Sequence, residues 1–147
     1  MGFYNSVEIS ASGLSAERLA MDVIANNIAN ANTTHTPGGG AFKRQLVVFG
    51  QKPGGPDETA DADGGAGSGG QGGVEVMGIV QDQTPDRLVF DPSNPDADAR
   101  GYVHYPNISV VKEMVDMMAA SRAYEANVSA MQEARNMTNA ALNILRS

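Results

Sequence analysis

Hydrophobic residues recur with a helical period at both ends of the chain, whereas the middle holds short apolar runs separated by glycine and proline. Residues 5–31 carry two apolar rows on roughly opposite faces of a predicted helix, with Arg18 interrupting the first. The first row comprises Val7, Ala11, Leu14, Met21, Ala25 and Ile28, and the second comprises Ile9, Ala16, Leu19, Ala20 and Val23. A helix that is apolar on two faces needs two sets of neighbours.

The beginning of this helix carries a capping signal. Asn5 is a candidate N-cap, and Glu8 stands three residues later, in the position that closes a capping box. Gly13 lies in the interior of the predicted helix, where glycine costs about 1 kcal/mol relative to alanine. We therefore expect the helix to begin near Asn5 and to bend or break at Gly13.

The end of the helix is rich in asparagine, at Asn26, Asn27, Asn30 and Asn32. Asparagine is a mediocre helix former that prefers caps and turns. These side chains either cap the carbonyls at the helix end or form hydrogen bonds across a subunit interface and fix its register. The sequence leaves both interpretations open.

Residues 107–146 give the strongest helical signal. Pro106 precedes the helix, Asn107 or Ser109 is a candidate cap, and the acidic Glu113 and Asp116 suit the positive end of a helix dipole. Alternating steps of four and three residues define a seam that is mostly apolar over five heptads. This seam comprises Val110, Met114, Met117, Ser121, Tyr124, Val128, Met131, Arg135, Thr138, Leu142 and Leu145.

Residues 32–106 lack helical periodicity and predict a small β-rich insert. Short runs rich in Val, Ile and Phe indicate strands of a small sheet at residues 42–51, 74–81 and 87–90, and residues 102–105 predict another brief extended piece. Residues 53–73 are almost entirely Gly, Pro, Asp, Ala and Ser, so we expect a mobile loop there. Residues 91–96, Asp-Pro-Ser-Asn-Pro-Asp, have the composition of tight turns.

These segments predict an α+β fold in which two long terminal helices, 5–31 and 107–146, bracket the insert 32–106. A lone helix hairpin has a thin core because its surface is large relative to its volume. The second apolar face of the first helix also lacks a partner within the chain. The pattern therefore predicts a subunit that its neighbours complete.

Composition narrows the functional classes. The formal net charge is −7, from 17 acidic and 10 scattered basic residues, which argues against binding to nucleic acid or to an anionic membrane surface. The chain has no cysteine, which excludes disulfides and thiolate chemistry. No segment approaches the length of a membrane span, and we expect no cleaved signal peptide at the N-terminus.

Three features resemble ligand sites but are better explained otherwise. Residues 65–70 match a Gly-x-Gly-x-x-Gly pattern without the flanking strand and helix that a phosphate loop requires. Asp57, Asp61 and Asp63 lack the closing glutamate of a calcium loop. His35 and His104 are far apart in sequence and lack a third ligand. We therefore assign no catalytic residue, metal or cofactor.

The family emerges from longer stretches of sequence. Residues 25–33, Ala-Asn-Asn-Ile-Ala-Asn-Ala-Asn-Thr, closely resemble the N-terminal signature of flagellar rod and hook proteins, and residues 13–19 resemble its opening. Residues 39–45 resemble the Gly-rich entry to the first strand of proximal rod proteins. Residues 90–108 and 113–127 resemble the same proximal rod proteins and not the distal rod or hook proteins.

This resemblance implies a structural subunit of the flagellar basal body. Such a protein passes through the flagellar type III export channel and polymerises into the hollow rod that crosses the periplasm. Its terminal helices pack in a coiled-coil-like manner in the tube wall and are loosely ordered before assembly. Its implied partners are other copies of itself, other rod proteins, and adjacent components of the basal-body rings and export gate, with no small-molecule substrate.

The predicted assembly interface lies on the two helices. It comprises Val7, Leu14, Met21, Asn27, Ile28, Asn30, Val110, Met114, Met117, Tyr124, Val128, Met131, Leu142 and Leu145. One alternative from a different class is a soluble helical adaptor or chaperone that binds partner helices through the Met-rich face of the second helix. Another is a different axial protein of the same family, and a small hydrolase is disfavoured because the sequence lacks a catalytic constellation.

Overall fold

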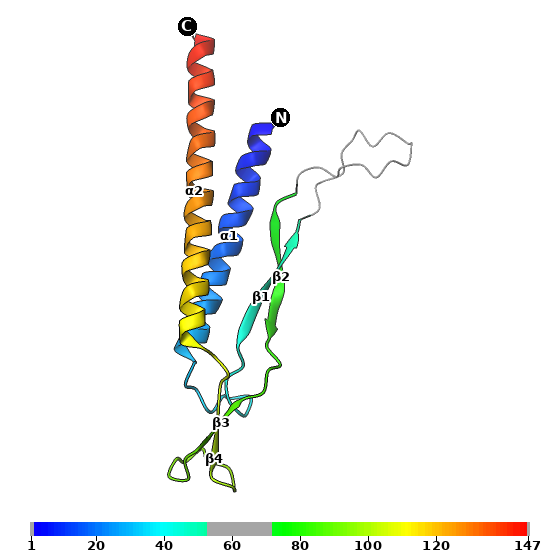
Figure 1. Cartoon of the computed structure of the whole chain (residues 1–147). Coiled ribbons are helices and arrows are strands. Elements are labelled where there is room, and N and C mark those ends of the chain that lie inside the picture. Colours follow the sequence, from blue (N-terminus) through cyan, green and yellow to red (C-terminus); the bar gives the residue numbers. More distant parts are fainter. Residues whose placement is uncertain (1, 53–71, 147) are drawn as a thin grey trace, which may run out of the picture. The chain divides into compact units, whose positions relative to one another are not determined.

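The computed structural model describes residues 2–52 and 72–146, and the side chains of residues 6–52 and 72–144. The fold is α+β, with a helix at each end of the chain and four short strands between them (Figure 1). The elements are α1 (Gly2–Ala29), β1 (Gln45–Gln51), β2 (Val74–Gln81), β3 (Arg87–Phe90), β4 (Tyr102–Tyr105) and α2 (Val110–Arg146). Within the described residues, neither helix combines the length and hydropathy needed to cross a lipid bilayer.

The chain divides into two compact units, and both helices contribute to each. The terminal unit comprises Met1–Arg18, Phe49–Met77 and Ser121–Ser147. The junction unit comprises Leu19–Val48 and Gly78–Ala120.

The capping box predicted for α1 is wrong. The helix begins at Gly2, so Asn5 lies inside its first turns and not at its N-cap. Glu8 instead forms an ion pair with Lys52, with 3.3 Å between Glu8 Oε1 and Lys52 Nζ. Both side chains are exposed, and such a pair stabilises a fold by at most about 1 kcal/mol.

Gly13 has a packing role in the terminal unit and does not split α1, which continues to Ala29. Gly13 is buried, and a Cβ atom at this position would stand 2.9 Å from Nδ2 of Asn127 on α2. The missing side chain thus makes room for a polar side chain of the other helix. This close approach compensates for the low helix propensity of glycine.

Ser109 caps α2, and Asn107 lies outside the helix. The backbone N–H of Lys112 donates to Ser109 Oγ over 3.5 Å, and that of Glu113 donates to the Ser109 carbonyl over 3.0 Å. The helix is continuous from Val110 to Arg146, and its most buried positions are Glu113, Ala120 and Ala134. This buried row lies one residue before Met114, Ser121 and Arg135 of the predicted seam.

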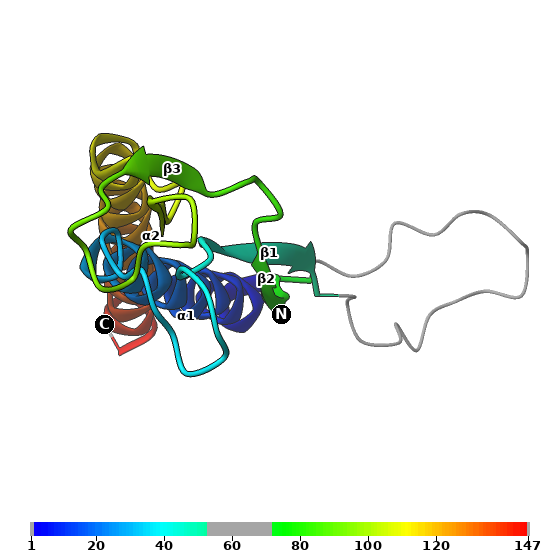
Figure 2. The ribbon, with the colours of Figure 1, turned by 90° about the horizontal axis from the view of Figure 1, so that it is seen from below.

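The three predicted strands and the extended piece at 102–105 all form strands, and they pair as two separate ladders and not as one small sheet. β1 pairs with β2, and the two lie side by side in both views (Figures 1 and 2). β3 pairs with β4 in antiparallel register, with Leu88 opposite His104 and Phe90 opposite Tyr102. β1 begins at Gln45, three residues later than predicted. The predicted loop 53–73 falls outside the described residues except at 72 and 73.

The connection between β3 and β4 is built from side chains that accept backbone hydrogen bonds. Asp91 Oδ1 accepts from the N–H and the hydroxyl of Ser93, and Asn94 Oδ1 accepts from the N–H of Asp96. Asp98 Oδ1 accepts from the N–H groups of Tyr102 at 2.9 Å and Arg100 at 2.8 Å. These contacts confirm the turn chemistry predicted from the sequence.

The hydrophobic core of the described residues consists of small side chains. Its buried members are Ala16, Ala20, Val23, Ala31, Ala41, Val103, Ala120 and Ala134. Large apolar side chains remain at the surface, among them Met77, Phe90, Val111 and Ile144. The isolated subunit therefore buries few of its large hydrophobic residues.

The Asp98 turn gives a pH-dependent prediction. The hydrogen bond from the Tyr102 N–H, with a smaller one from Arg100, holds the pKa of Asp98 below its ordinary value. Because the folded pKa is lowered, the stabilisation is present at neutral pH and is lost as the pH falls through that lowered pKa. We expect Asp98→Ala to speed hydrogen exchange of the Arg100 and Tyr102 amides at pH 7, measured by NMR.

Asp98→Asn is the matched control, because its side-chain oxygen still accepts both bonds and does not titrate. Its protection at these two amides should be close to wild type at neutral pH and should not fall on acidification. Equal protection in the alanine variant would show that the carboxylate does not hold the turn.

Candidate assembly interface

Most residues of the predicted interface are partly exposed. Asn30 and the large apolar residues of the first α1 row are half-buried, as is much of the α2 set: Val7, Leu14, Met21, Ile28, Asn30, Val110, Met117, Tyr124, Val128 and Met131. Met114 and Leu142 are exposed, and Asn27 is buried. The side chain of Leu145 lies outside the described part of the chain. Each half-buried residue thus keeps surface that another molecule can cover.

Asn27 pairs with the first residue of β1 as a neighbouring strand would. Its Nδ2 donates to the Gln45 carbonyl over 2.8 Å, and its Oδ1 accepts from the Gln45 N–H over 2.9 Å. Nδ2 also donates to Oε2 of Glu113 over 3.0 Å. Both donors and one of the two acceptor positions of this buried amide are therefore used within the subunit.

Glu113 is the most deeply buried charged residue of the described chain, with 1% of its surface exposed. Its Oε1 accepts from Arg44 Nε over 2.6 Å, while its Oε2 accepts from Asn27. Arg44 also donates to Asp116, three residues after Glu113 on α2, with 3.3 Å between Nη2 and Oδ2. We call Asn27, Arg44, Gln45, Glu113 and Asp116 the polar junction.

The polar junction connects three elements of the junction unit: α1, β1 with the residue before it, and the first turn of α2. A carboxylate without partners in such a place is strongly destabilising, whereas a fully paired one is tolerated. No buried side-chain nitrogen or oxygen of the described residues lacks a partner. Glu113 also sits in the first helical turn, where the helix dipole favours negative charge.

Asn30 caps a carbonyl at the end of α1, as one of the two interpretations predicted. Asn30 Nδ2 donates to the Asn26 carbonyl over 3.0 Å and to Asn26 Oδ1 over 2.6 Å. Asn30 Oδ1 in turn accepts from the Thr33 hydroxyl over 3.1 Å. Asn27 follows neither interpretation within the subunit, because it links the helix to a strand and to α2.

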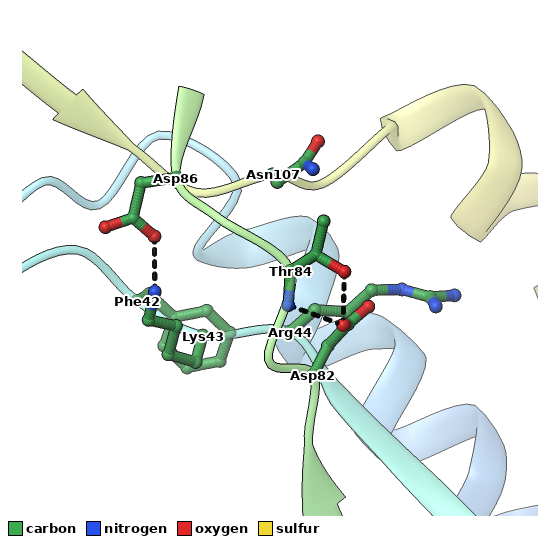
Figure 3. Close-up of a pocket in the computed structure, with 7 residues that line it drawn as sticks. All are labelled: Phe42, Lys43, Arg44, Asp82, Thr84, Asp86 and Asn107. Carbon is green, nitrogen blue, oxygen red and sulfur yellow. Dashed lines mark hydrogen bonds and ion pairs between the residues drawn. The ribbon is translucent and has the colours of Figure 1, made fainter. Parts of the chain in front are cut away.

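A small hollow beside the polar junction is lined by side chains that pair with one another. Figure 3 shows its lining of Phe42, Lys43, Arg44, Asp82, Thr84, Asp86 and Asn107. Lys43 and Asp86 form an ion pair of 2.6 Å, and the hydroxyl and N–H of Thr84 both donate to Asp82. The Thr84 bonds, chiefly that of the hydroxyl, lower the pKa of Asp82. The charged and polar side chains of residues 82–86 that line the hollow are thus engaged in local ion pairs and hydrogen bonds.

Neither histidine belongs to a group of candidate metal ligands among the described residues. His104 is half-exposed with its Nδ1 3.6 Å from Oδ2 of Asp86, and His35 is exposed. Among the described residues, His, Asp and Glu side chains do not gather in a group of three or more that fits a metal ion. The candidate calcium and phosphate loops fall outside the described residues.

The outward face of the first turns of α2 is apolar. Val111, Met114, Val115 and Met118 are 53–74% exposed, on the side of the helix opposite to the buried Glu113. We call these four residues the apolar ridge. Apolar faces of this kind on a folded chain mark surfaces that bind another molecule.

Comparison with known proteins identifies the family. Residues 8–34 match the family described as "Flagella basal body rod protein", and residues 99–144 match "Flagellar basal body rod FlgEFG protein C-terminal". The chain is 42% identical to the flagellar basal-body rod protein FlgC of Borreliella burgdorferi, over 99% of both chains. It is 40% identical to FlgC of Bacillus subtilis over 98% of this chain and 99% of that one, and 39% identical to FlgC of Escherichia coli O157:H7 over 93% of each.

The chain belongs to the FlgC family of flagellar basal-body rod proteins. Members of this family are structural proteins of the rod, and this chain is accordingly a structural rod subunit of the flagellar basal body. The family resemblance expected from the sequence is thereby confirmed.

The two segments that match family models overlap the polar junction in part. Asn27 lies in the first matched segment and Glu113 in the second, whereas Arg44 lies between them. Sequence reasoning identified Asn27 as unusual, but it assigned Glu113 only to the helix dipole and gave Arg44 no role. The available signal was a polar row on α2, Glu113 and Asn127, spaced in heptads with Ala120 and Ala134.

The junction predicts a large stability effect at Glu113. Glu113→Ala leaves Asn27 and Arg44 without their shared partner and should cost about 3–5 kcal/mol of unfolding free energy. Glu113→Gln keeps one acceptor and should cost less. The measurement is urea unfolding of the purified chain, followed by far-UV circular dichroism.

The matched control is Glu125→Ala, which removes an exposed carboxylate from the same helix. We expect it to change the unfolding free energy by no more than about 0.5 kcal/mol. Equal unfolding midpoints for the alanine variants at 113 and 125 would mean that the buried pair does not stabilise the fold.

Proposed function

We propose that this rod subunit polymerises through its terminal helices, so that the helices of many copies form the wall of the hollow rod. The observation that carries the proposal is the contrast between the thin alanine and valine core and the large apolar residues left outside it. A polymer that covers these residues gains the hydrophobic stabilisation that the single subunit lacks.

The helices would pack together in a coiled-coil-like manner within this wall. In the junction unit, Asn27 contacts Glu113. Ala20 lies seven residues before Asn27 on α1, and Ala120 lies seven residues after Glu113 on α2; both are buried. In the terminal unit, Gly13 lies against Asn127. Small residues at such spacings permit close approach of two helices.

The half-buried apolar row of α1 supports contacts between copies. Val7, Leu14, Met21 and Ile28 recur at seven-residue intervals and are only half-buried. On α2, Met117, Tyr124 and Met131 have the same spacing and the same partial exposure. We propose that neighbouring subunits cover the remaining surface of these residues.

The remaining parts of the proposal concern location and partners. We propose that the subunit is exported without cleavage of a signal peptide and takes its place in the proximal rod, where the rod crosses the periplasm. Its neighbours there would be copies of itself, other rod proteins, and components of the basal-body rings and export gate. The acidic net charge and the apolar helix faces suit contacts with protein and not with nucleic acid.

Substitution at the helix faces tests the proposed polymerisation. Ile28→Asp and Val128→Asp each place a charge in a surface that the polymer would bury, and a buried unpaired charge is costly. We expect either variant to be expressed but absent from isolated basal bodies, with loss of swimming in soft agar. Ser129→Asp, at an exposed neighbouring position, should swim as wild type does.

The soluble adaptor is the second candidate, and the exposed methionines of α2 favour it. Amide hydrogen exchange separates the two functions. For a polymerising subunit we expect exchange across residues 5–31 and 107–146 to be faster in the free chain than in basal bodies, where these residues gain strong protection. Equal protection in both states, or absence of the chain from basal bodies, would favour the adaptor.

A further inference from the structure

The apolar ridge continues into a charged pair along the same face of α2. The ridge residues Met114 and Met118 are followed one turn later by Arg122 and then by Glu125, at steps of four, four and three. All four side chains are exposed. Read along the helix, this face presents two large apolar side chains, a cation and an anion.

The outward face of α1 has the opposite character. Ala29, Ala25, Asp22 and Arg18 are exposed and follow one another, in the direction against the chain, at steps of four, three and four. Met21 and Ile28 stand beside this face and are half-buried. Read in this direction, the face presents two small side chains, an anion and a cation.

The two faces are complementary in size and in charge when the helices run antiparallel. Met114 and Glu125 of α2 are eleven positions apart, as are Ala29 and Arg18 of α1. Aligning them places each methionine opposite an alanine, Arg122 opposite Asp22, and Glu125 opposite Arg18. Alanine leaves the space that a methionine side chain fills, and both ion pairs join opposite charges.

We propose that the apolar ridge of one subunit docks on the Ala25–Ala29 face of α1 in a second copy of this chain, with Arg122 beside Asp22 and Glu125 beside Arg18. This inference rests on the proposed polymerisation and names the faces that meet. Because the two faces are different surfaces of one chain, each copy offers a free ridge and a free alanine face after every contact. Such a heterologous contact extends into an open array, as a rod requires.

Cysteine cross-linking tests the contact directly, because the chain has no cysteine of its own. Ala25→Cys and Met118→Cys are made in separate, differently tagged copies that are expressed together, and basal bodies are isolated and oxidised. The expected result is a disulfide-linked pair that carries both tags. Ala25→Cys combined with Met137→Cys, at another exposed position of α2, should give no such product.

The possible outcomes of the cross-linking distinguish an error in the proposed contact from an error in the proposed polymerisation. A product between two Met118→Cys copies would show ridge against ridge and overturn the proposal. Both variants in basal bodies without a product between positions 25 and 118 would overturn it too, while leaving polymerisation intact. Absence of the unaltered chain from basal bodies would overturn the proposed polymerisation itself.

Swapping the charges of Asp22 and Arg122 gives a second test of the contact that needs no cysteine. Asp22→Arg and Arg122→Asp each place like charges opposite one another, and each should lose most incorporation into basal bodies. The double variant restores an opposite pair at every contact and should regain incorporation and swimming. Failure of the double variant to exceed either single variant would overturn the proposed pairing, even if the cysteine variants fail to assemble.

Discussion

The buried carboxylate of Glu113 is the constraint on which the junction unit depends. A charge with almost no access to water must find compensating partners, and none lies next to it in the sequence. Arg44 and Asn27 come from two other elements, so the carboxylate is satisfied only when all three elements have converged. The same residues that are costly when separated therefore specify one arrangement when they meet.

Small side chains determine what the helices can do beyond this junction. Alanine and glycine at the buried positions allow close approach, but they contribute little apolar area to a core. The large apolar residues consequently lie on outward faces, and the subunit holds much of its hydrophobic surface outside itself. A family of rod proteins can use this division, with polar contacts fixing the subunit and apolar contacts joining its copies.

Local features of the fold could be predicted from the sequence, whereas contacts between distant segments could not. The strands at 42–51, 74–81 and 87–90 are predictable because Val, Ile and Phe runs end at glycine and proline, and Ser109 is one of two recognisable candidate caps. Their division into two ladders depends on pairing partners that local composition does not reveal. The sequence did not reveal the row of α2 that the subunit buries, Glu113, Ala120 and Ala134, because the predicted seam follows the larger apolar residues, which the subunit leaves partly exposed.

The paired hydrogen bonds between Asn27 and Gln45 have a mechanical consequence. Apolar contacts are non-directional, so two surfaces held by them alone can slide past each other at little cost. The Asn27 amide instead grips both the N–H and the carbonyl of one backbone position, and a displacement of β1 along α1 must break both bonds together. The junction therefore resists shear between helix and strand, because two directional bonds must break before β1 can move along α1.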